Sequence, residues 1–271
     1  QSSAQGHPSR HREALPKRRQ LTMPGLRNKL DVQEVSSVLG PHGLLATQLP
    51  GTMDYGSSMI PAGPDRFLLA FGGIQPAVGA TGVDEIRLVL LDRQGIPVDE
   101  HVMVNATGMQ RQTQPRLLRT EDDQIFLVWG RKQAIGEAHH YDVMLRGLGV
   151  TGDKIAWATD ERQVNLSPIG VAPQPAIVIG PAGRAVFWVV DVEQGLSLHA
   201  RWIDPNGVPE GSAIGILPKA VSSIMNLTGI FSERTFFLAW RQPATQDLQV
   251  LQLENDLDFL NSEILATDIA P

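Results

Sequence analysis

The stretch Gln124-Ile125-Phe126-Leu127-Val128-Trp129 decides the fold, because the chain repeats its pattern at three other places. The other copies are Arg66-Phe67-Leu68-Leu69-Ala70-Phe71, Ala185-Val186-Phe187-Trp188-Val189-Val190 and Thr235-Phe236-Phe237-Leu238-Ala239-Trp240. Self-similarity at a period of roughly 40 to 50 residues is the signature of a β-propeller or a related array. The repeat therefore predicts the architecture before any local pattern does.

The repeated runs are continuously apolar, which is typical of strands that are buried on both faces. In a propeller, the middle strands of each blade lie between neighbouring blades. The large aromatic residues of the runs are therefore predicted to pack between blades, with stacking on sugars or bases as the alternative. These residues are Trp129, Phe187 or Trp188, and Trp240.

Each run is predicted to be the second of four strands in its unit. The predicted strands cover residues 57–62, 66–71, 85–92 and 98–104, then 114–119, 124–129, 141–148 and 154–159, then 173–179, 185–190, 196–203 and 212–217, and finally 227–231, 235–240, 248–253 and 264–267. The turn between the third and fourth strands contains Gly95, Gly152 or Gly207 in the first three units, and glycine supplies the positive φ that such turns require. The fourth unit has Asn255-Asp256-Leu257-Asp258 there, so a longer or irregular turn is predicted.

A half unit precedes the four full ones. Residues 31–39, the turn Gly40-Pro41-His42-Gly43 and residues 44–49 match a third strand, its turn and an outer strand. A two-stranded hairpin leaves an unpaired edge, which proteins normally cover or pair. The prediction is an all-β propeller over residues 31–271 with an extended N-terminal arm over 1–30. The half blade covers 31–50, and the four full blades cover about 56–110, 111–168, 169–223 and 224–271.

The arm is basic, whereas the rest of the chain is acidic. Residues 1–30 carry seven Lys or Arg and one Glu, a net charge of +6, so the remaining residues carry −12 of the total of −6. Such an arm is typical of an interaction tail, with a solvated, disordered terminus as the alternative. The candidate partner-binding residues are Arg10, Arg12, Lys17, Arg18, Arg19 and Arg27.

The second unit carries the residues of a recognisable repeat. Val104-Asn105, Gln114-Pro115, the strand ending at Trp129, Tyr141-Asp142-Val143 through Arg146, Gly152 and Val164-Asn165 follow one another in order. This order resembles a degenerate β-propeller repeat of secreted and cell-surface bacterial proteins. The resemblance covers about residues 31–271, and it implies a periplasmic, secreted or cell-surface location and an interaction or scaffold role.

Motifs for catalysis, metals or cofactors are sparse. Propeller glycosidases need carboxylates that converge on the central shaft. Asp54 is the best-placed acid, Glu121-Asp122-Asp123 is expected to be a solvated turn, and the predicted inner strands carry no Asp or Glu. The adjacent His139 and His140 would point to opposite faces of a strand and could not share a metal. We therefore predict neither a metal site nor a cofactor site.

The expected function is non-enzymatic. The main prediction is a structural or accessory subunit, or an interaction scaffold, of a larger assembly outside the cytoplasm, with other protein subunits bound at the open blade edge and the arm. Two alternatives are open. One is a propeller that binds or hydrolyses carbohydrate, and the other is polyanion binding through the arm, although nucleic acid would be repelled by the acidic body.

Overall fold

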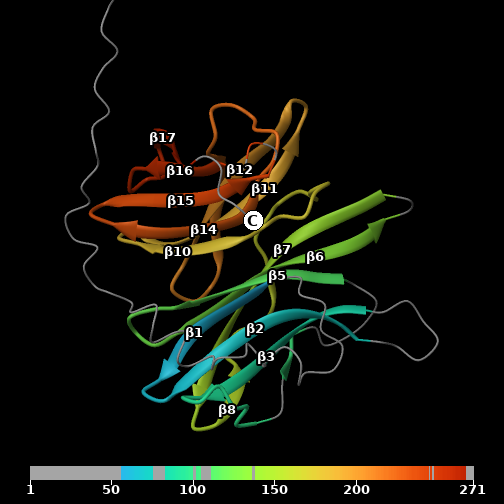
Figure 1. Cartoon of the computed structure of the whole chain (residues 1–271), viewed down its shortest axis with the longest axis vertical. Helices are drawn as coiled ribbons and strands as arrows, with labels where there is room; N and C mark the ends of the chain where they lie inside the picture. Colours follow the sequence, from blue (N-terminus) through green and yellow to red (C-terminus); the bar gives the residue numbers. More distant parts are fainter. Residues whose placement is uncertain are drawn as a thin grey trace, which may run out of the picture.

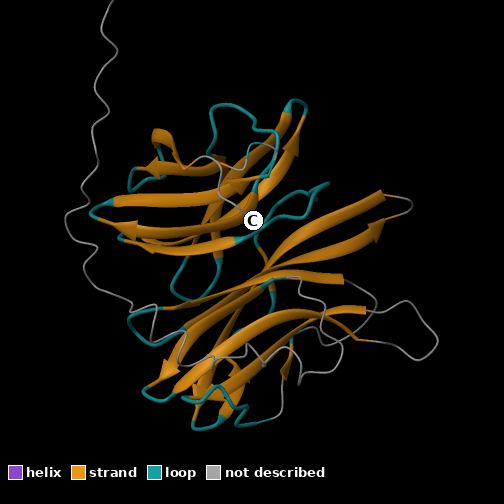
Figure 2. Cartoon of the chain, in the orientation of Figure 1, coloured by secondary structure: helices purple, strands orange, loops and turns teal. Residues whose placement is uncertain are grey.

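The computed structural model describes residues 56–75, 83–99, 102–104, 111–135, 138–243, 245 and 247–266. The predicted arm (1–30), the half blade (31–50) and Asp54 lie outside these ranges. Every regular element in the described ranges is a strand (Figure 2), so they contain no helix long and apolar enough to cross a membrane. This confirms the predicted all-β class.

The strands form four antiparallel sheets, arranged as the blades of a propeller (Figure 1). Blade 1 holds β1 (Ser57–Gly63), β2 (Arg66–Gln75), β3 (Val83–Asp92) and β4 (Val102–Met103). Blade 2 holds β5 (Arg111–Arg119), β6 (Ile125–Ile135), β7 (Ala138–Thr151) and β8 (Lys154–Trp157), with β9 (Arg162–Gln163) paired to β7. Blade 3 holds β10 (Ala176–Gly180), β11 (Gly183–Val192), β12 (Gly195–Ile203) and β13 (Pro209–Gly215). Blade 4 holds β14 (Met225–Ser232), β15 (Thr235–Gln242), β16 (Asp247–Leu253) and β17 (Phe259–Ala266).

The second and third strands lie where the sequence predicts them, although some are longer: β6 runs to Ile135, six residues beyond its predicted end. The outer strands differ more. A strand was predicted over 98–104, but β4 has only two residues, and among the described residues before it Pro97 forms an isolated bridge with Leu91. The short β9 was not predicted at all, and β17 begins five residues earlier than expected. An outer strand pairs on one side only, so its apolar pattern is the weakest of the four.

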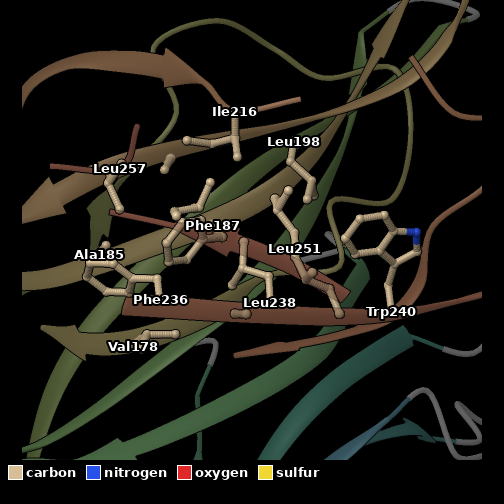
Figure 3. Packing of buried hydrophobic residues seen from close by; sticks show 14 of the residues in the cluster. Val178, Ala185, Phe187, Leu198, Ile216, Phe236, Leu238, Trp240, Leu251 and Leu257 are labelled. Atoms are coloured by element: carbon tan, nitrogen blue, oxygen red, sulfur yellow. The ribbon is translucent and has the colours of Figure 1, made fainter. Parts of the chain in front are cut away.

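The core lies between the blades because successive residues of one strand point to opposite faces. On β6, Leu127 and Trp129 pack towards blade 1, whereas Phe126 and Val128 pack towards blade 3. The same alternation joins blades 3 and 4 through Phe187, Phe236 and other apolar side chains (Figure 3). The predicted inter-blade packing of the aromatic residues is confirmed, since Trp129, Trp188 and Trp240 are at most 2% exposed.

The turn after β16 is regular, which corrects the prediction of a longer or irregular one. Leu257 N donates to Glu254 O at 3.0 Å, as Gly207 N donates to Asp204 O in blade 3, also at 3.0 Å. Leu257 thus occupies the glycine position, with φ at 75°. A left-handed leucine is strained by about 1–2 kcal/mol. Burial offsets the strain, because Leu257 is only 2% exposed within the core of blades 3 and 4.

Candidate functional site

The first strands of consecutive blades contact one another in the order β1, β5, β10, β14, so their starts lie along a common axis. Near each start, from two residues before it to three residues after it, stands one residue in the left-handed region. These are Gly56 (φ 101°), Gln114 (57°), Gln174 (46°) and Asn226 (56°). Left-handed φ is easy for glycine and uncommon for glutamine. Because a left-handed residue recurs at this place in all four blades, the four positions are structurally equivalent. We call these four residues, together with Arg116, the axial set.

Side-chain amides of the axial set connect one blade to the next. Gln174 N donates to Oε1 of Gln114 at 3.0 Å, and Asn226 N donates to Oε1 of Gln174 at 3.0 Å. Each glutamine therefore reaches forward and satisfies the backbone of its equivalent in the following blade. Blade 1 has Gly56 at this position, so it has no side chain with which to reach Gln114. The amide chain thus runs from blade 2 to blade 4.

Arg116 connects blade 1 to blade 2 instead. Its Nη1 donates to Pro115 O at 3.0 Å and to Ser57 O at 3.4 Å, and burial lowers the pKa of its guanidinium below the ordinary arginine value. Nearby, Leu117 N donates to Ser58 Oγ at 2.9 Å. A first strand is a sheet edge with unpaired backbone groups. Here the Ser58 hydroxyl and the Arg116 guanidinium form hydrogen bonds with some of these backbone groups. Polar side chains therefore lie close together at the axis.

Buried acids recur at a second position, the start of the third strand. Glu85, Asp142 and Asp247 occupy equivalent places in blades 1, 2 and 4, and each is at most 8% exposed. Glu85 is paired with Arg87 on its own strand. The third strand lies two strand spacings, roughly 10 Å, from the first strand. These acids therefore lie away from the axis and do not converge on one point there.

Asp142 accepts hydrogen bonds from three side chains. Arg131 Nη2 donates to its Oδ2 at 3.1 Å, and Gln163 Nε2 donates to its Oδ1 at 3.0 Å. Gln133 donates to the same carboxylate, and Arg131 also pairs with Glu161 at 2.5 Å. A carboxylate that accepts hydrogen bonds from this many side chains connects β6, β7 and the loop around β9.

The acids singled out by sequence do not form a catalytic pair in the described structure. Asp54 lies outside the described ranges. Glu121, Asp122 and Asp123 are exposed, as expected of a solvated turn, and Arg119 pairs with Asp123 at 2.8 Å. A hydrogen bond with the Thr120 side chain is the main cause of the lowered pKa of Asp122. The four first strands, over the bounds that the structure gives them, contain no Asp or Glu.

Metal ligands and the basic arm give no further site in the described part of the chain. His139 is exposed and His140 is half-buried, and no group of three potential metal ligands occurs among the residues that the structure covers. The six basic residues predicted to bind a partner all lie in the arm, outside the described residues. Their role stays a prediction.

The axial set was not predicted from the sequence as a site. Gln114-Pro115 and Gln174-Pro175 were visible as repeated pairs, but nothing local shows that the glutamine side chain reaches the next blade. Chemically, the set presents amide and guanidinium groups, and the hydroxyl of Ser58 lies near Arg116. Amides and hydroxyls both donate and accept hydrogen bonds, and guanidinium donates through a planar fork. This combination can donate hydrogen bonds to, and accept them from, a hydroxyl-rich ligand.

Comparison with known proteins identifies the fold of the chain but no family to which it belongs. No family model matches the chain, and no curated protein matches it. Among solved structures, a protein of unknown function from Dyadobacter fermentans has a TM-score of 0.54 and 14% identity, over 82% of this chain and 76% of that one. A family 117 glycoside hydrolase from the marine bacterium Zobellia galactanivorans has a TM-score of 0.52 and 12% identity, over 79% of this chain and 70% of that one. A thermostable family 43 glycoside hydrolase has a TM-score of 0.50 and 10% identity, over 79% and 75% of the two chains.

These likenesses confirm a propeller fold. They also contradict the expected main function, a non-enzymatic structural subunit or interaction scaffold, because two of these three structures are glycoside hydrolases. Of the functions considered from sequence, the carbohydrate alternative fits the comparisons better. The main prediction failed because a repeat pattern reports how blades pack, and it carries no information about what binds at their axis.

Proposed function

We propose that this protein is a carbohydrate-binding propeller that holds a neutral oligosaccharide at the axial set. The single observation that carries the proposal is the row of Gln114, Gln174 and Asn226, connected from blade to blade at the axis next to Arg116. The fold shared with glycoside hydrolases supports the ligand class. The resemblance of the repeat to those of secreted and cell-surface bacterial proteins supports a place outside the cytoplasm, where oligosaccharides are met.

The geometry supports binding because the polar groups are held in place before a ligand arrives. Each glutamine oxygen is fixed by a backbone N–H of the next blade, so its Nε2 group has a set direction and two N–H donors. Binding sites gain affinity when their polar groups need no ordering on association. A net charge of −12 on residues 31–271 disfavours acidic polysaccharides, which leaves neutral ones.

The test is binding of neutral pentose and hexose oligosaccharides, first on an array and then by calorimetry. The variant Arg116→Met removes a guanidinium of the axial set and keeps most of its apolar stem. We expect it to weaken binding roughly tenfold to a hundredfold, as removal of a charged hydrogen-bond donor does. Arg93→Met is the matched control, because Arg93 is 70% exposed in the turn after β3, where it makes only a long ion pair with Asp65.

Binding unaffected by Arg116→Met, with both variants melting within a few degrees of the parent, would remove the axial set as the site. Binding lost equally in Arg93→Met and Arg116→Met would also contradict the proposal, since the two arginines share only their charge. Silence of the whole array would count against the carbohydrate class itself.

Glycoside hydrolysis is the second candidate, and the shared fold is the observation that favours it. The chemistry requires two carboxyl groups on either side of the bond that is cleaved. The described first strands supply none, so the acids would have to come from elsewhere, with Asp54, two residues before Gly56, as the first choice. New reducing ends from a bound oligosaccharide, abolished by Asp54→Asn with binding retained, would establish hydrolysis in place of binding alone.

A further inference from the structure

Three of the four apolar clusters in the described structure join two neighbouring blades. One cluster contains residues of blades 1 and 2, the next contains residues of blades 2 and 3, and another contains residues of blades 3 and 4. The fourth cluster is different. It consists of Phe71, Val89 and Leu91 with partly buried Met59, Phe67 and Leu69, and every one of these belongs to blade 1.

This fourth cluster lies on the face of blade 1 that points away from blade 2. On β3, Leu88 packs towards blade 2, so its neighbour Val89 must point the other way. The cross-strand partners confirm the shared face, because Met59 pairs with Leu69 and Leu69 pairs with Val89. The ion pair of Glu85 and Arg87 belongs to the same face. We call this surface the outer face of blade 1.

The outer face of blade 1 is buried although no described blade packs on it. Val89 and Leu91 are each 1% exposed, and Arg87 is 5% exposed. Blade 4 shows what a bare outer face looks like in the same architecture. There, Ile230 is 53% exposed, and Phe237 and Val250, on the same side, are only partly buried. The contrast indicates that blade 1 is covered and that its cover lies outside the described residues.

We propose that the cover is residues 31–50 of the same chain, the half blade of the sequence analysis, packed against the outer face of blade 1. Consecutive blades are neighbours at each of the three other junctions, and this segment comes directly before blade 1. Residues 50–56 separate Leu49 from β1, and this linker has the same length as the one between β4 and β5, residues 104–110. The segment also supplies apolar residues to bury, among them Val35 and Leu45.

The absence of cysteine from the chain makes thiol labelling a clean test. Val89→Cys places a thiol in the outer face of blade 1, Val186→Cys places one in the described core between blades 2 and 3, and Ile230→Cys places one on the bare face of blade 4. In the full chain, we expect Val89→Cys to react with a soluble disulfide reagent as slowly as Val186→Cys and roughly a hundredfold more slowly than Ile230→Cys.

The cover is then disturbed within the segment itself. Adding Val35→Asp and Leu45→Asp should speed the reaction of Val89→Cys about tenfold or more and leave that of Val186→Cys unchanged, because only a local contact is lost. Ser36→Asp with Gln48→Asp is the matched control, since it adds the same charges at polar positions of the same predicted strands, on the faces opposite to Val35 and Leu45. It should leave both rates unchanged.

The proposal would be overturned by rapid reaction of Val89→Cys in the otherwise unaltered chain, by no effect of the aspartates at 35 and 45, or by an equal effect of those at 36 and 48. Protection of Val89→Cys that disappears on dilution would also overturn it, because a second copy would then be the cover. If the aspartates at 35 and 45 expose Val186→Cys as well, Val35→Ala with Leu45→Ala is measured instead, under the same criteria.

Discussion

Replacing Gly130 with alanine tests how tightly the axial set depends on packing between blades 2 and 3. Gly130 lies on β6, opposite Thr113 of β5. A Cβ added to it would lie 2.8 Å from Pro173 Cγ, 3.0 Å from Pro173 Cδ and 3.0 Å from Thr113 Oγ1. Non-bonded carbon atoms are most stable at about 3.5 to 4.0 Å. The new methyl group therefore requires a displacement of roughly 0.7 to 1 Å.

Neither neighbour can give way easily. Pro173 is a buried ring without rotamers to change, and the residues after Thr113 and Pro173 are Gln114 and Gln174, which are joined by the 3.0 Å hydrogen bond of the axial set. Overpacking of this kind costs about 1–3 kcal/mol. For a protein of this size, a cost of about 2 kcal/mol lowers Tm by roughly 4 to 8 °C.

The assay is thermal and urea unfolding of Gly130→Ala beside Gly149→Ala, combined with oligosaccharide binding. A Cβ at Gly149 meets no atom within 4 Å, so this control should be neutral or slightly stabilising. We expect Gly130→Ala to lose both stability and binding. Equal stability of the two variants would refute the packing argument, and a destabilised Gly130→Ala that still binds fully would refute its connection to the axial set.

Three other predictions concern stability, and urea unfolding checks each of them. Burial lowers the pKa of His199 below 6.5 in the folded protein. Between about pH 6.5 and that lowered pKa, the unfolded chain therefore binds more protons than the folded one, and the free energy of unfolding falls as the pH falls. His199→Gln should make the loss of stability between pH 8 and pH 5 smaller. Leu257→Gly relieves a left-handed leucine but removes a buried side chain, and we expect a net loss of about 1–3 kcal/mol; a gain would mean that strain outweighs burial. Phe236→Ala should cost about 3–5 kcal/mol, because Phe236 is fully buried against Phe187, Trp202 and Phe231, and a cost below 1 kcal/mol would contradict this packing.

Sequence reasoning predicted the parts of the fold that depend on the local pattern. From Ile125 to Trp129 every residue is apolar because successive residues pack alternately on blades 1 and 3, and this pattern can be read directly from the sequence. The outer strands were predicted poorly, as β4 and β9 show. A strand at the edge of a sheet does not require a regular pattern of apolar residues on either face, so its sequence gives little signal. The turn that contains Leu257 was predicted wrongly for another reason. The burial that offsets the strain of its left-handed φ comes from residues that are distant in the chain.

The candidate site depended on tertiary structure almost completely. The sequence by itself determined a repeated four-strand unit, a charge contrast between arm and body, and first strands without carboxylates. Only the tertiary structure decided that Gln114, Gln174 and Asn226, more than 50 residues apart, meet at one axis and hydrogen-bond in series. The physical reason is that a repeat encodes contacts within and between blades through alternation, whereas the direction of an amide at the axis is set by the backbone of the next blade.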